Sequence, residues 1–327
     1  MLQTLKETWH RVCGTPSGGR VAPALPPPTA AELAAIDALR RRADALARAQ
    51  GGERAGSHAL WQAHLQRFRE LLQTADPREF LRWDVVRRTM FGGSQSYVQP
   101  ELDALRGLED WETRWRPAIR ESAVGRPKRY GAYPESSGNL IHHAYHLARF
   151  EAATRRRVDA LQRVFEFGGG YGSMCRLFRQ LGFRGQYVCY DFPEFAALQE
   201  FFLRSLDIPV AADLAATGST GAALCLSDLP ALRTVLADWR GRPDTLFLAT
   251  WSISETPLET RNVILPLVSA CACYLIAYQH EIPALNNREF FTRWAAEQAD
   301  VAWQHTDIEH LPGSAYLFGA RRSRPVP

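Results

Sequence analysis

The pattern of apolar and polar residues changes along the chain. In its first part, apolar residues recur at helical spacing in several successive segments, as they do in amphipathic helices. The first segment opens with Thr29 and carries Glu32 three residues later, a combination typical of a helix start. We expect amphipathic helices over residues 29–50, 57–74, 76–91 and 99–121.

The second part alternates short apolar runs with helical segments. We expect strands over residues 163–167, 185–192, 222–228, 245–252, 272–279, 301–306 and 315–321, and helices over residues 173–182, 193–206, 259–270 and 287–298. This alternation predicts an α/β fold with a doubly wound, Rossmann-like and mostly parallel sheet of seven strands. Only a short loop separates the last two strands, so we expect them to form an antiparallel C-terminal hairpin.

The same change in pattern sets the expected domain boundaries. The stretch "GTPSGGRVAPALPPPT" predicts that residues 1–28 form a flexible N-terminal arm. Residues 29–150 form an expected helical N-terminal region, which ends in a loop over residues 124–139 and a further histidine-containing segment. Residues 151–327 form the expected α/β domain.

Composition narrows the class of protein only slightly. A hydrophobic content of 46%, a charged content of 23% and a net charge of +4 are ordinary, and we expect no nucleic-acid partner. The longest apolar run, residues 263–278, is interrupted by Pro266 and Ser269, so we expect no membrane span. Six cysteines without a C-x-x-C pair and an N-terminus without an apolar signal core favour a cytoplasmic location. The sequence leaves open whether the chain forms a homo-oligomer.

A glycine-rich junction stands between the first expected strand and the next helix, in "RVFEFGGGYGSMCRLF" (residues 163–178). It contains Gly168, Gly169, Gly170 and Gly172. Glycines at this place allow a sharp turn and let a ligand approach the backbone, because no Cβ atom intervenes. The same loop suits a dinucleotide or a nucleoside, so further residues must decide between them.

Three residues near the junction favour one ligand. Ser173 stands where a dinucleotide-binding loop would have its third glycine or an alanine. Glu166, at the end of the strand, can attract an ammonium group, and Asp191, nineteen residues after Gly172, can accept hydrogen bonds from ribose hydroxyls. S-adenosylmethionine carries an amino-acid end and a ribose but no phosphate, and it therefore fits the pattern.

This layout resembles the class I S-adenosylmethionine-dependent methyltransferases over about residues 163–321. Within that superfamily, several stretches resemble the sugar O-methyltransferases of bacterial polysaccharide and glycoside clusters: "FEFGGGYGSMCR", "YDFPEF", "LATWSISETP", "LIAYQ", "NNREFF", "WRPAIRESAVGRP" and "NLIHHAYHL". The resemblance implies a methyltransferase that uses S-adenosyl-L-methionine and acts on a sugar hydroxyl of a polysaccharide or glycosylated metabolite. It also implies that the helical region 29–150 covers the acceptor site.

The resemblance assigns roles to individual residues. The resemblance implies Glu166, Gly168, Gly170 and Gly172 for the methionine part, Asp191 for the ribose and Asp228 for adenine. Gly169 and Phe192 complete the expected cofactor-binding set, together with Trp251, which could shape the pocket. Asp213 is an alternative to Asp228 if the register differs.

Methyl transfer to a hydroxyl needs help, because a neutral hydroxyl is a poor nucleophile. The candidate general bases are His142 and His143 in "NLIHHAYHLARF" and Glu255 in "TWSISET". His142 and His146 have the spacing of a metal-binding pair on a helix, but no glutamate follows the first histidine as in a zincin, and we expect no metal. A structural role for the histidines, as cap and packing residues, stays open.

Further residues are candidates for acceptor binding: Tyr130, Asn139, His146, Ser252, Ser254, Tyr278 and Gln279. Ser254 or Thr256 also suits the cap of the following helix, and His305 and His310 are interpreted as structural. Three alternatives remain beside the sugar hypothesis. They are a methyltransferase acting on a small-molecule or peptide natural product, a non-catalytic protein with the methyltransferase fold, and an NAD-dependent enzyme.

Overall fold

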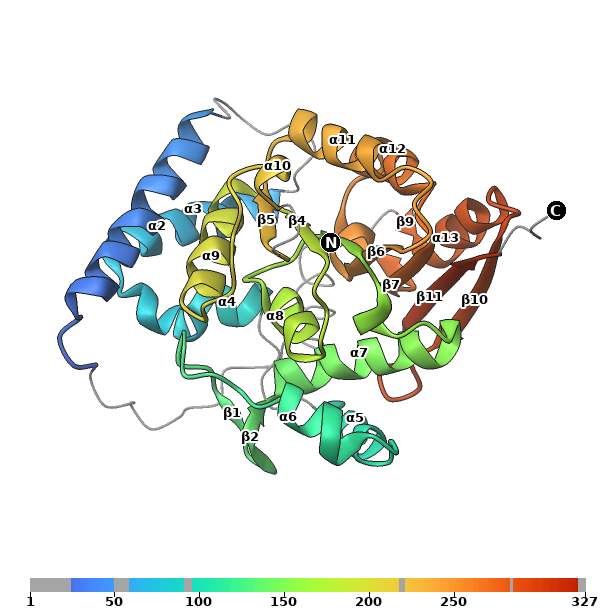
Figure 1. Ribbon diagram of the computed structural model, residues 1–327, viewed down its shortest axis with the longest axis horizontal. Helices are drawn as coiled ribbons and strands as arrows, with labels where there is room; N and C mark the ends of the chain where they lie inside the picture. The colour runs from blue at the N-terminus through green and yellow to red at the C-terminus, as the bar shows by residue number, and fades with distance from the viewer. Residues whose placement is uncertain (1–24, 50–58, 91–95, 218–220, 283–284, 323–327) are drawn as a thin grey trace.

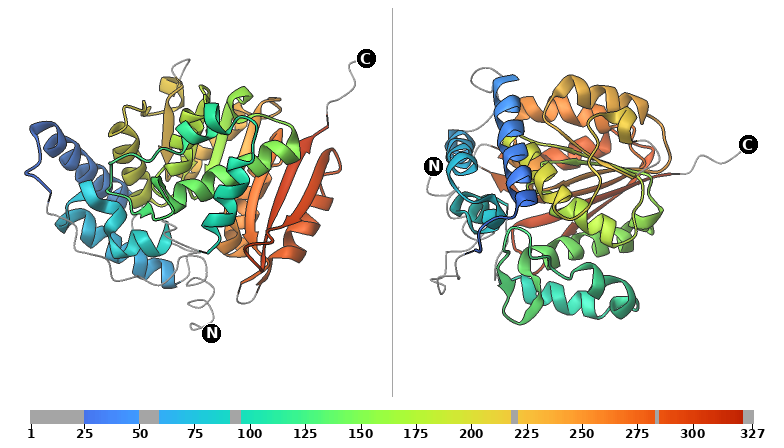
Figure 2. Two further views of the ribbon diagram at one scale, coloured as in Figure 1. Left: turned by 90° about the horizontal axis from the view of Figure 1, so that it is seen from below. Right: turned by 60° about the vertical axis from the view of Figure 1, so that its left-hand side comes forward.

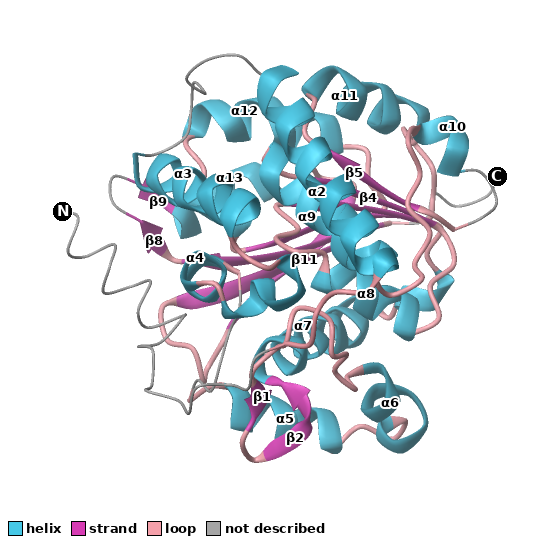
Figure 3. Ribbon diagram, turned by 90° about the vertical axis from the view of Figure 1, so that its left-hand side faces the viewer, coloured by secondary structure: helices cyan, strands magenta, loops and turns pink. Residues whose placement is uncertain are grey.

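The computed structural model describes residues 25–49, 59–90, 96–217, 221–282 and 285–322. Most of the expected N-terminal arm therefore lies outside the described residues. A central sheet is covered by helices on both faces (Figure 1), and Figure 3 shows this sheet nearly edge-on between α11 and α12 on one side and α7 and α8 on the other. No helix within the described ranges is long and apolar enough to cross a membrane.

The central sheet has the order β10-β11-β7-β6-β3-β4-β5. Its strands are β3 (Arg163–Phe167), β4 (Gln186–Tyr190), β5 (Ala223–Leu226), β6 (Thr245–Thr250), β7 (Cys273–Gln279), β10 (Val301–Asp307) and β11 (Ser314–Arg321). The strands β3 to β7 run parallel, whereas β11 is antiparallel to both β7 and β10. The predicted seven-stranded, mostly parallel sheet with a C-terminal hairpin is confirmed. Its strand order reverses between β3 and β6, where the crevice of such folds lies.

Helical segments precede and flank the sheet. Those before it are α2 (Ala30–Ala49), α3 (Ala59–Thr74), η1 (Pro77–Arg82), α4 (Asp84–Thr89), α5 (Val98–Arg106), η2 (Trp111–Trp115), α6 (Arg116–Ala118) and α7 (Gly138–Thr154). Those within the α/β part are η3 (Val158–Ala160), α8 (Ser173–Gln180), α9 (Pro193–Arg204), α10 (Leu214–Thr217), α11 (Leu229–Asp238), η4 (Ser252–Glu255), α12 (Leu258–Val268) and α13 (Asn287–Ala296). Figure 2 shows α2 and α3 at the α9 side of the molecule, far from the β10–β11 hairpin.

Three predicted segments were wrong in detail. The single helix expected over 76–91 is two short helices, because the backbone of Trp83 between them is extended. Both short helices still bury apolar residues. The helix expected over 99–121 ends at Gly107, a residue that weakens helices, and a π-helical turn follows it. The loop expected over 124–139 contains a hairpin of β1 (Arg129–Tyr130) and β2 (Tyr133–Ser137). A second small hairpin pairs β8 (Glu281–Ile282) with β9 (Leu285–Asn286).

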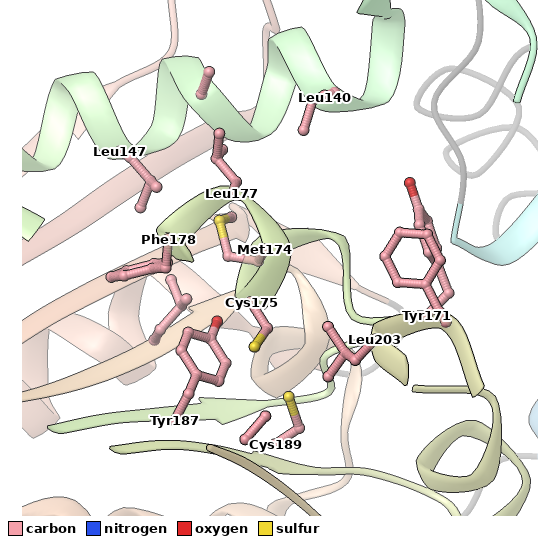
Figure 4. Close-up of a cluster of buried hydrophobic side chains, with 14 of the residues drawn as sticks. Leu140, Leu147, Tyr171, Met174, Cys175, Leu177, Phe178, Tyr187, Cys189 and Leu203 are labelled. Carbon is pink, nitrogen blue, oxygen red and sulfur yellow. The ribbon is translucent and has the colours of Figure 1, made fainter. Parts of the chain in front are cut away.

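Both faces of the sheet are buried, and the packing on one of them fixes α7 in place. Leu140 and Leu147 of α7 point toward Met174 and Leu177 of α8 (Figure 4). Tyr187 of β4 belongs to the same buried cluster. All five side chains are almost completely buried. Burying such a side chain contributes about 1.5–3 kcal/mol, so α7 is a firm platform for the histidines along it. It also extends past residue 150, the expected end of the helical region, and the division into domains stays a prediction.

Candidate functional site

The glycine-rich junction forms a tight turn after β3. Gly168, Gly170 and Gly172 have φ angles of 74°, 57° and 92°, in the left-handed region that favours glycine. A Cβ atom on Gly168 would overlap the side chain of Ser252, which lies just after β6. The turn can therefore approach the end of β6 only because the residue is glycine.

Asp191 links this turn to the end of β4. The backbone N–H of Gly170 donates to Oδ2 of Asp191 at 2.9 Å, and that of Phe192 donates to Oδ1 at 2.8 Å. The amide of Gln199 donates to the carbonyl of Gly170 at 3.0 Å. Burial raises the pKa of Asp191 to about 7. Three residues expected to bind the cofactor thus lie together at the carboxyl edge of the sheet.

Glu166 lies beneath the turn. Its side chain is 4% exposed, and Oε2 accepts a hydrogen bond of 2.8 Å from the hydroxyl of Tyr187. A Cβ atom on Gly169 would come within 2.9 Å of the same Oε2. Burial raises the pKa of Glu166 to about 7. The carboxyl group supports the turn from below, and direct contact with a cofactor stays a prediction.

The two candidate adenine-binding residues are both exposed helix caps. Asp228 accepts a hydrogen bond of 2.9 Å from the backbone of Ala231 at the start of α11. Asp213 accepts one of 2.8 Å from the backbone of Ala216 beside α10. Neither contact favours one residue over the other, and both assignments stay predictions.

Trp251 follows β6 and has an unusual backbone. Its φ of 68° and ψ of −39° are rare for a residue with a side chain and cost of order 1–3 kcal/mol. Its N–H donates to the carbonyl of Ala277 at 2.7 Å, which helps to hold this conformation. The indole lies parallel to the ring of His142, with centroids 6.2 Å apart, and edge-on to that of His146 at 6.1 Å. Backbone strain of this kind is common at functional sites.

His142 is held by a buried carboxylate. Its Nδ1 lies 2.7 Å from Oε1 of Glu101 on α5, and His310 Nε2 lies 3.0 Å from the same oxygen. Burial opposes the charge of Glu101, but the two imidazoles outweigh this effect and hold its pKa below the usual range. Nδ1 of His142 therefore donates to a carboxylate, and the lone pair of the neutral ring is on Nε2. Nε2 is buried and has no hydrogen-bond partner among the described residues.

Glu101 was missed by sequence reasoning, although a signal was present. It lies on the same face of α5 as the buried Val98 and Leu105, three and four residues away. A charged residue on the apolar face of a helix needs a partner, because an unpaired buried charge is costly. That position pointed to a buried ion pair.

His146 and His143 lie in different surroundings from His142. His146 is fully buried one turn farther along α7, with its ring centroid 4.1 Å from that of His142 and its Nδ1 2.6 Å from the hydroxyl of Tyr316. His143 faces Ser173, whose hydroxyl lies 3.2 Å from its Nδ1. Burial lowers the pKa of His143 to about 3, so that it is a weak base.

Glu255 is bonded to an amide rather than to an imidazole. The side-chain amide of Gln279 donates to its Oε1 at 3.0 Å, and the hydroxyl of Ser254 donates to Gln279 at 2.7 Å. Burial raises the pKa of Glu255 to about 7. The hydroxyl oxygen of Ser254 also lies 2.6 Å from the carbonyl oxygen of Trp251, so its single proton is shared between two acceptors and this network fixes the loop after β6.

Arg261, a fully buried residue of α12, anchors the same loop. Its guanidinium donates to the carbonyls of Ser254 at 2.6 Å and Thr256 at 3.0 Å, and to the side chain of Asn287 at 2.8 Å. Burial lowers its pKa to about 10. The sequence analysis missed this residue, because an arginine within a helix is usually exposed.

The remaining acceptor-binding candidates hydrogen-bond within the protein. The hydroxyl of Ser252 donates to the carbonyl of Phe167, and the amide of Asn139 donates to the hydroxyl of Tyr171 at 3.0 Å. The hydroxyl of Tyr130 donates to Gln99 at 3.1 Å. Tyr278 packs against α13 on the face of the sheet opposite α7, with its hydroxyl 3.2 Å from His305. Of this set, His146 is the one that joins His142 beside Trp251.

The described part of the chain holds no group of three or more His, Cys, Asp or Glu side chains placed to bind a metal ion. The Nδ1 atoms of His142 and His146 are engaged by Glu101 and Tyr316. The two histidines with metal-binding spacing in the sequence, His142 and His146, thus make hydrogen bonds to two different side chains.

No protein-family model matches the chain, and no curated protein matches it in sequence. Among solved structures, it is similar to magnesium protoporphyrin IX methyltransferase from Synechocystis PCC 6803 with bound SAM, at 14% identity and a TM-score of 0.38, over 55% of this chain and 80% of that one. Precorrin-6y C5,15-methyltransferase from Geobacter metallireducens is similar at 12% identity and a TM-score of 0.37, over 57% of this chain and 89% of that one. Aeropyrum pernix fibrillarin with bound S-adenosyl-L-methionine is similar at 12% identity and a TM-score of 0.34, over 50% of this chain and 67% of that one. Likenesses with scores this low carry no conclusion about the function of this chain.

Proposed function

We propose that the chain is an S-adenosylmethionine-dependent O-methyltransferase that methylates a sugar hydroxyl of a polysaccharide or glycosylated metabolite. The observation that carries this proposal is the state of His142. Its Nδ1 is bonded to a buried carboxylate, and its Nε2 has no partner among the described residues. This imidazole lies beside Trp251, the residue after β6, and Ser252 next to it contacts the glycine turn. A base and a ligand-binding turn are therefore close neighbours at one edge of the sheet.

The residues of the turn fit the cofactor. Gly168 and Gly170 give the turn φ angles that residues with a side chain rarely adopt, and Asp191 beside them is only partly buried. These residues would hold the cofactor, with the Asp191 carboxyl group accepting hydrogen bonds from ribose hydroxyls. When bound, S-adenosylmethionine supplies a methyl group on a positively charged sulfur, which keeps the C–S electron pair as the acceptor oxygen takes the methyl group.

His142 is the best of the three candidate bases. Its Nε2 can take the hydroxyl proton, and the Glu101 carboxylate stabilises the imidazolium that forms. The pKa of His143 is lowered to about 3, which makes it too weak a base. Glu255, with a pKa of about 7, is partly protonated at neutral pH and is tied to Gln279. General-base catalysis of this kind contributes about 10²–10⁴-fold to a rate.

The sugar acceptor rests on the stretches that resemble sugar O-methyltransferases, together with a base suited to a hydroxyl. We would incubate the full chain with methyl-labelled S-adenosylmethionine and a panel of methyl glycosides, nucleotide sugars and oligosaccharides. Phenolic natural products and short peptides form the second arm. His142→Asn tests the base, and His64→Asn on α3 is the matched control.

Labelled sugar from wild type and from His64→Asn, with the label lost in His142→Asn, is the expected result. Label in the second arm alone would keep methyl transfer and overturn the sugar acceptor. Cofactor binding without labelling of any acceptor would favour a non-catalytic protein with this fold.

A further inference from the structure

Two buried histidines lie side by side on α7 with different hydrogen-bond partners. Nδ1 of His142 faces the Glu101 carboxylate, which only accepts hydrogen bonds, so Nδ1 carries a proton and the lone pair of the neutral form is on Nε2. Nδ1 of His146 faces the hydroxyl of Tyr316 at 2.6 Å. The partner of His142 is a carboxylate and that of His146 is a hydroxyl, so the two rings can carry their protons on different nitrogens.

The contact with Tyr316 indicates that the proton of His146 is on Nε2. Burial holds the pKa of Tyr316 well above its usual value, so the hydroxyl keeps its proton. If His146 donated from Nδ1, the buried O–H of Tyr316 would have no acceptor among the contacts of the described residues. Tyr316 therefore donates to Nδ1, and the proton of His146 is on Nε2. Burial, together with the neighbouring His142, lowers the pKa of His146 well below its usual value and keeps the ring neutral.

The two Nε2 atoms form a complementary pair. His142 is 5% exposed and His146 is fully buried, and neither Nε2 has a partner among the described residues. The ring centroids are 4.1 Å apart, and both rings lie within about the same distance of the Trp251 indole. An oxygen atom about 2.9 Å from each Nε2 would hydrogen-bond to both rings. One nitrogen offers a lone pair and the other offers an N–H.

We propose that His142 and His146 together bind the reacting hydroxyl, and that Tyr316 is a positioning residue that sets the tautomer of His146. The hydroxyl oxygen accepts from Nε2–H of His146, and its O–H donates to Nε2 of His142. This inference rests on the proposed function and names the class of acceptor, a neutral hydroxyl.

The pair discriminates against charged acceptors. A carboxylate has no proton to donate to His142, and an ammonium group has no lone pair to accept from His146. Either would leave one buried nitrogen unpaired, and a site built to bond a hydroxyl rejects such analogues strongly.

The test reads the two tautomers directly. The full chain, labelled with ¹⁵N in its histidines, is studied by long-range ¹H–¹⁵N correlation NMR with and without S-adenosylhomocysteine, with signals assigned through His142→Asn and His146→Asn. We expect the proton of His142 on Nδ1 and that of His146 on Nε2. Tyr316→Phe should turn His146 into a mixture of tautomers. Tyr274→Phe, which removes a buried hydroxyl bonded to the carbonyl of Val268 on the other face, is the control.

The same tautomer in both rings, or a charged His146 at neutral pH, would overturn the inference. A second measurement uses the methyl glycoside that is labelled in the acceptor screen. Tyr316→Phe should lower kcat/KM for it about tenfold with the affinity for S-adenosylhomocysteine unchanged, and an unchanged kcat/KM would also overturn the inference. The tautomers are readable without any ligand, so failure to bind S-adenosylhomocysteine would count against the proposed function alone.

Discussion

Glu101, which is fully buried, and Glu255, which is partly buried, differ in the kind of group that holds them. Two imidazoles hold Glu101, and its pKa lies below the usual range. A neutral amide holds Glu255, and burial raises its pKa to about 7. The partner thus decides whether a buried glutamate stays charged at neutral pH, and the residue type alone does not.

The surroundings of the two acids differ in the same way. We call the first set the base side: Glu101, His142 and His146. We call the second the anchor side: Glu255, Gln279, Arg261 and Ser252. On the base side, two ring nitrogens are left without partners among the described residues. On the anchor side, the polar groups bond to each other and to backbone carbonyls that fix the loop after β6. The base side is therefore expected to control turnover and the anchor side stability.

The largest effect is expected on the base side. Glu101→Gln removes the charge that stabilises an imidazolium at His142, and methyl transfer to the sugar acceptor should fall by about 10²–10⁴-fold. Glu255→Gln should change the rate only a few-fold, because this acid is not in contact with an imidazole. Initial rates at saturating cofactor measure both. A greater loss of rate in Glu255→Gln than in Glu101→Gln would contradict the roles given to the base side and the anchor side.

The next effect tests the contact between the glycine turn and the anchor side. Gly168 and Gly241 both have a φ of 74°, but a Cβ atom on Gly168 would overlap Ser252, whereas Gly241 has no neighbour within 4 Å. Gly241→Ala should cost about 1–2 kcal/mol for its backbone conformation. Gly168→Ala should cost about 1–3 kcal/mol more through overpacking. Urea denaturation measures both, and equal costs would show that the turn and the loop are not in close contact.

A smaller effect is expected at Arg261. Arg261→Met leaves the buried carbonyls of Ser254 and Thr256 without these donors, which should lower the free energy of unfolding by about 1–3 kcal/mol. Arg233→Met, at an exposed position on α11, is the matched control and should change it little. A loss of turnover in Arg261→Met with unchanged stability would contradict the anchoring role.

The smallest effect concerns pH. The folded pKa of Glu255 is raised to about 7, above its unfolded value of about 4.3. Its stabilising contribution is therefore present below about pH 4 and is lost as the pH rises to about 7. Between these limits, the free energy of unfolding of wild type should fall relative to that of Glu255→Gln. Urea denaturation across this range measures the difference, and parallel curves would contradict the raised pKa.

The contribution of Glu101 to stability should depend on pH in the opposite direction. Its folded pKa is lowered, so its contribution is present above its unfolded pKa and is lost as the pH falls through the folded one. Wild type should therefore lose stability relative to Glu101→Gln only in acid. A difference that appears near neutral pH instead would contradict the hydrogen bonds of Glu101 with His142 and His310.

The fold could be predicted from the sequence because its periodic signals are local. Each strand of the sheet is a short apolar run, and the glycine turn stands directly between β3 and α8. The breaks at Trp83 and Gly107 were missed because apolar residues keep a helical spacing on both sides of them. The residues near the turn were predictable for the same reason: Asp191 ends the strand next to β3.

The partners of the histidines were not predictable, because they come from distant parts of the chain. Glu101 and His310 meet across 209 residues, and His146 and Tyr316 across 170. Periodicity places each residue on a face of its own element, but only the packing of α5 and β11 against α7 brings them into contact. The sequence therefore left three candidate bases, which differ in the partners that the fold supplies.

The proposed function requires that this edge of the sheet binds S-adenosylmethionine, and titration calorimetry with S-adenosylhomocysteine measures this binding without an acceptor. We expect binding by wild type and by the control Asp238→Ala, an exposed position at the end of α11. We expect at least tenfold weaker binding by Asp191→Asn, because the amide puts a donor group in place of one of the two acceptor oxygens. No binding by wild type, or equal binding by all three proteins, would contradict binding at this edge of the sheet.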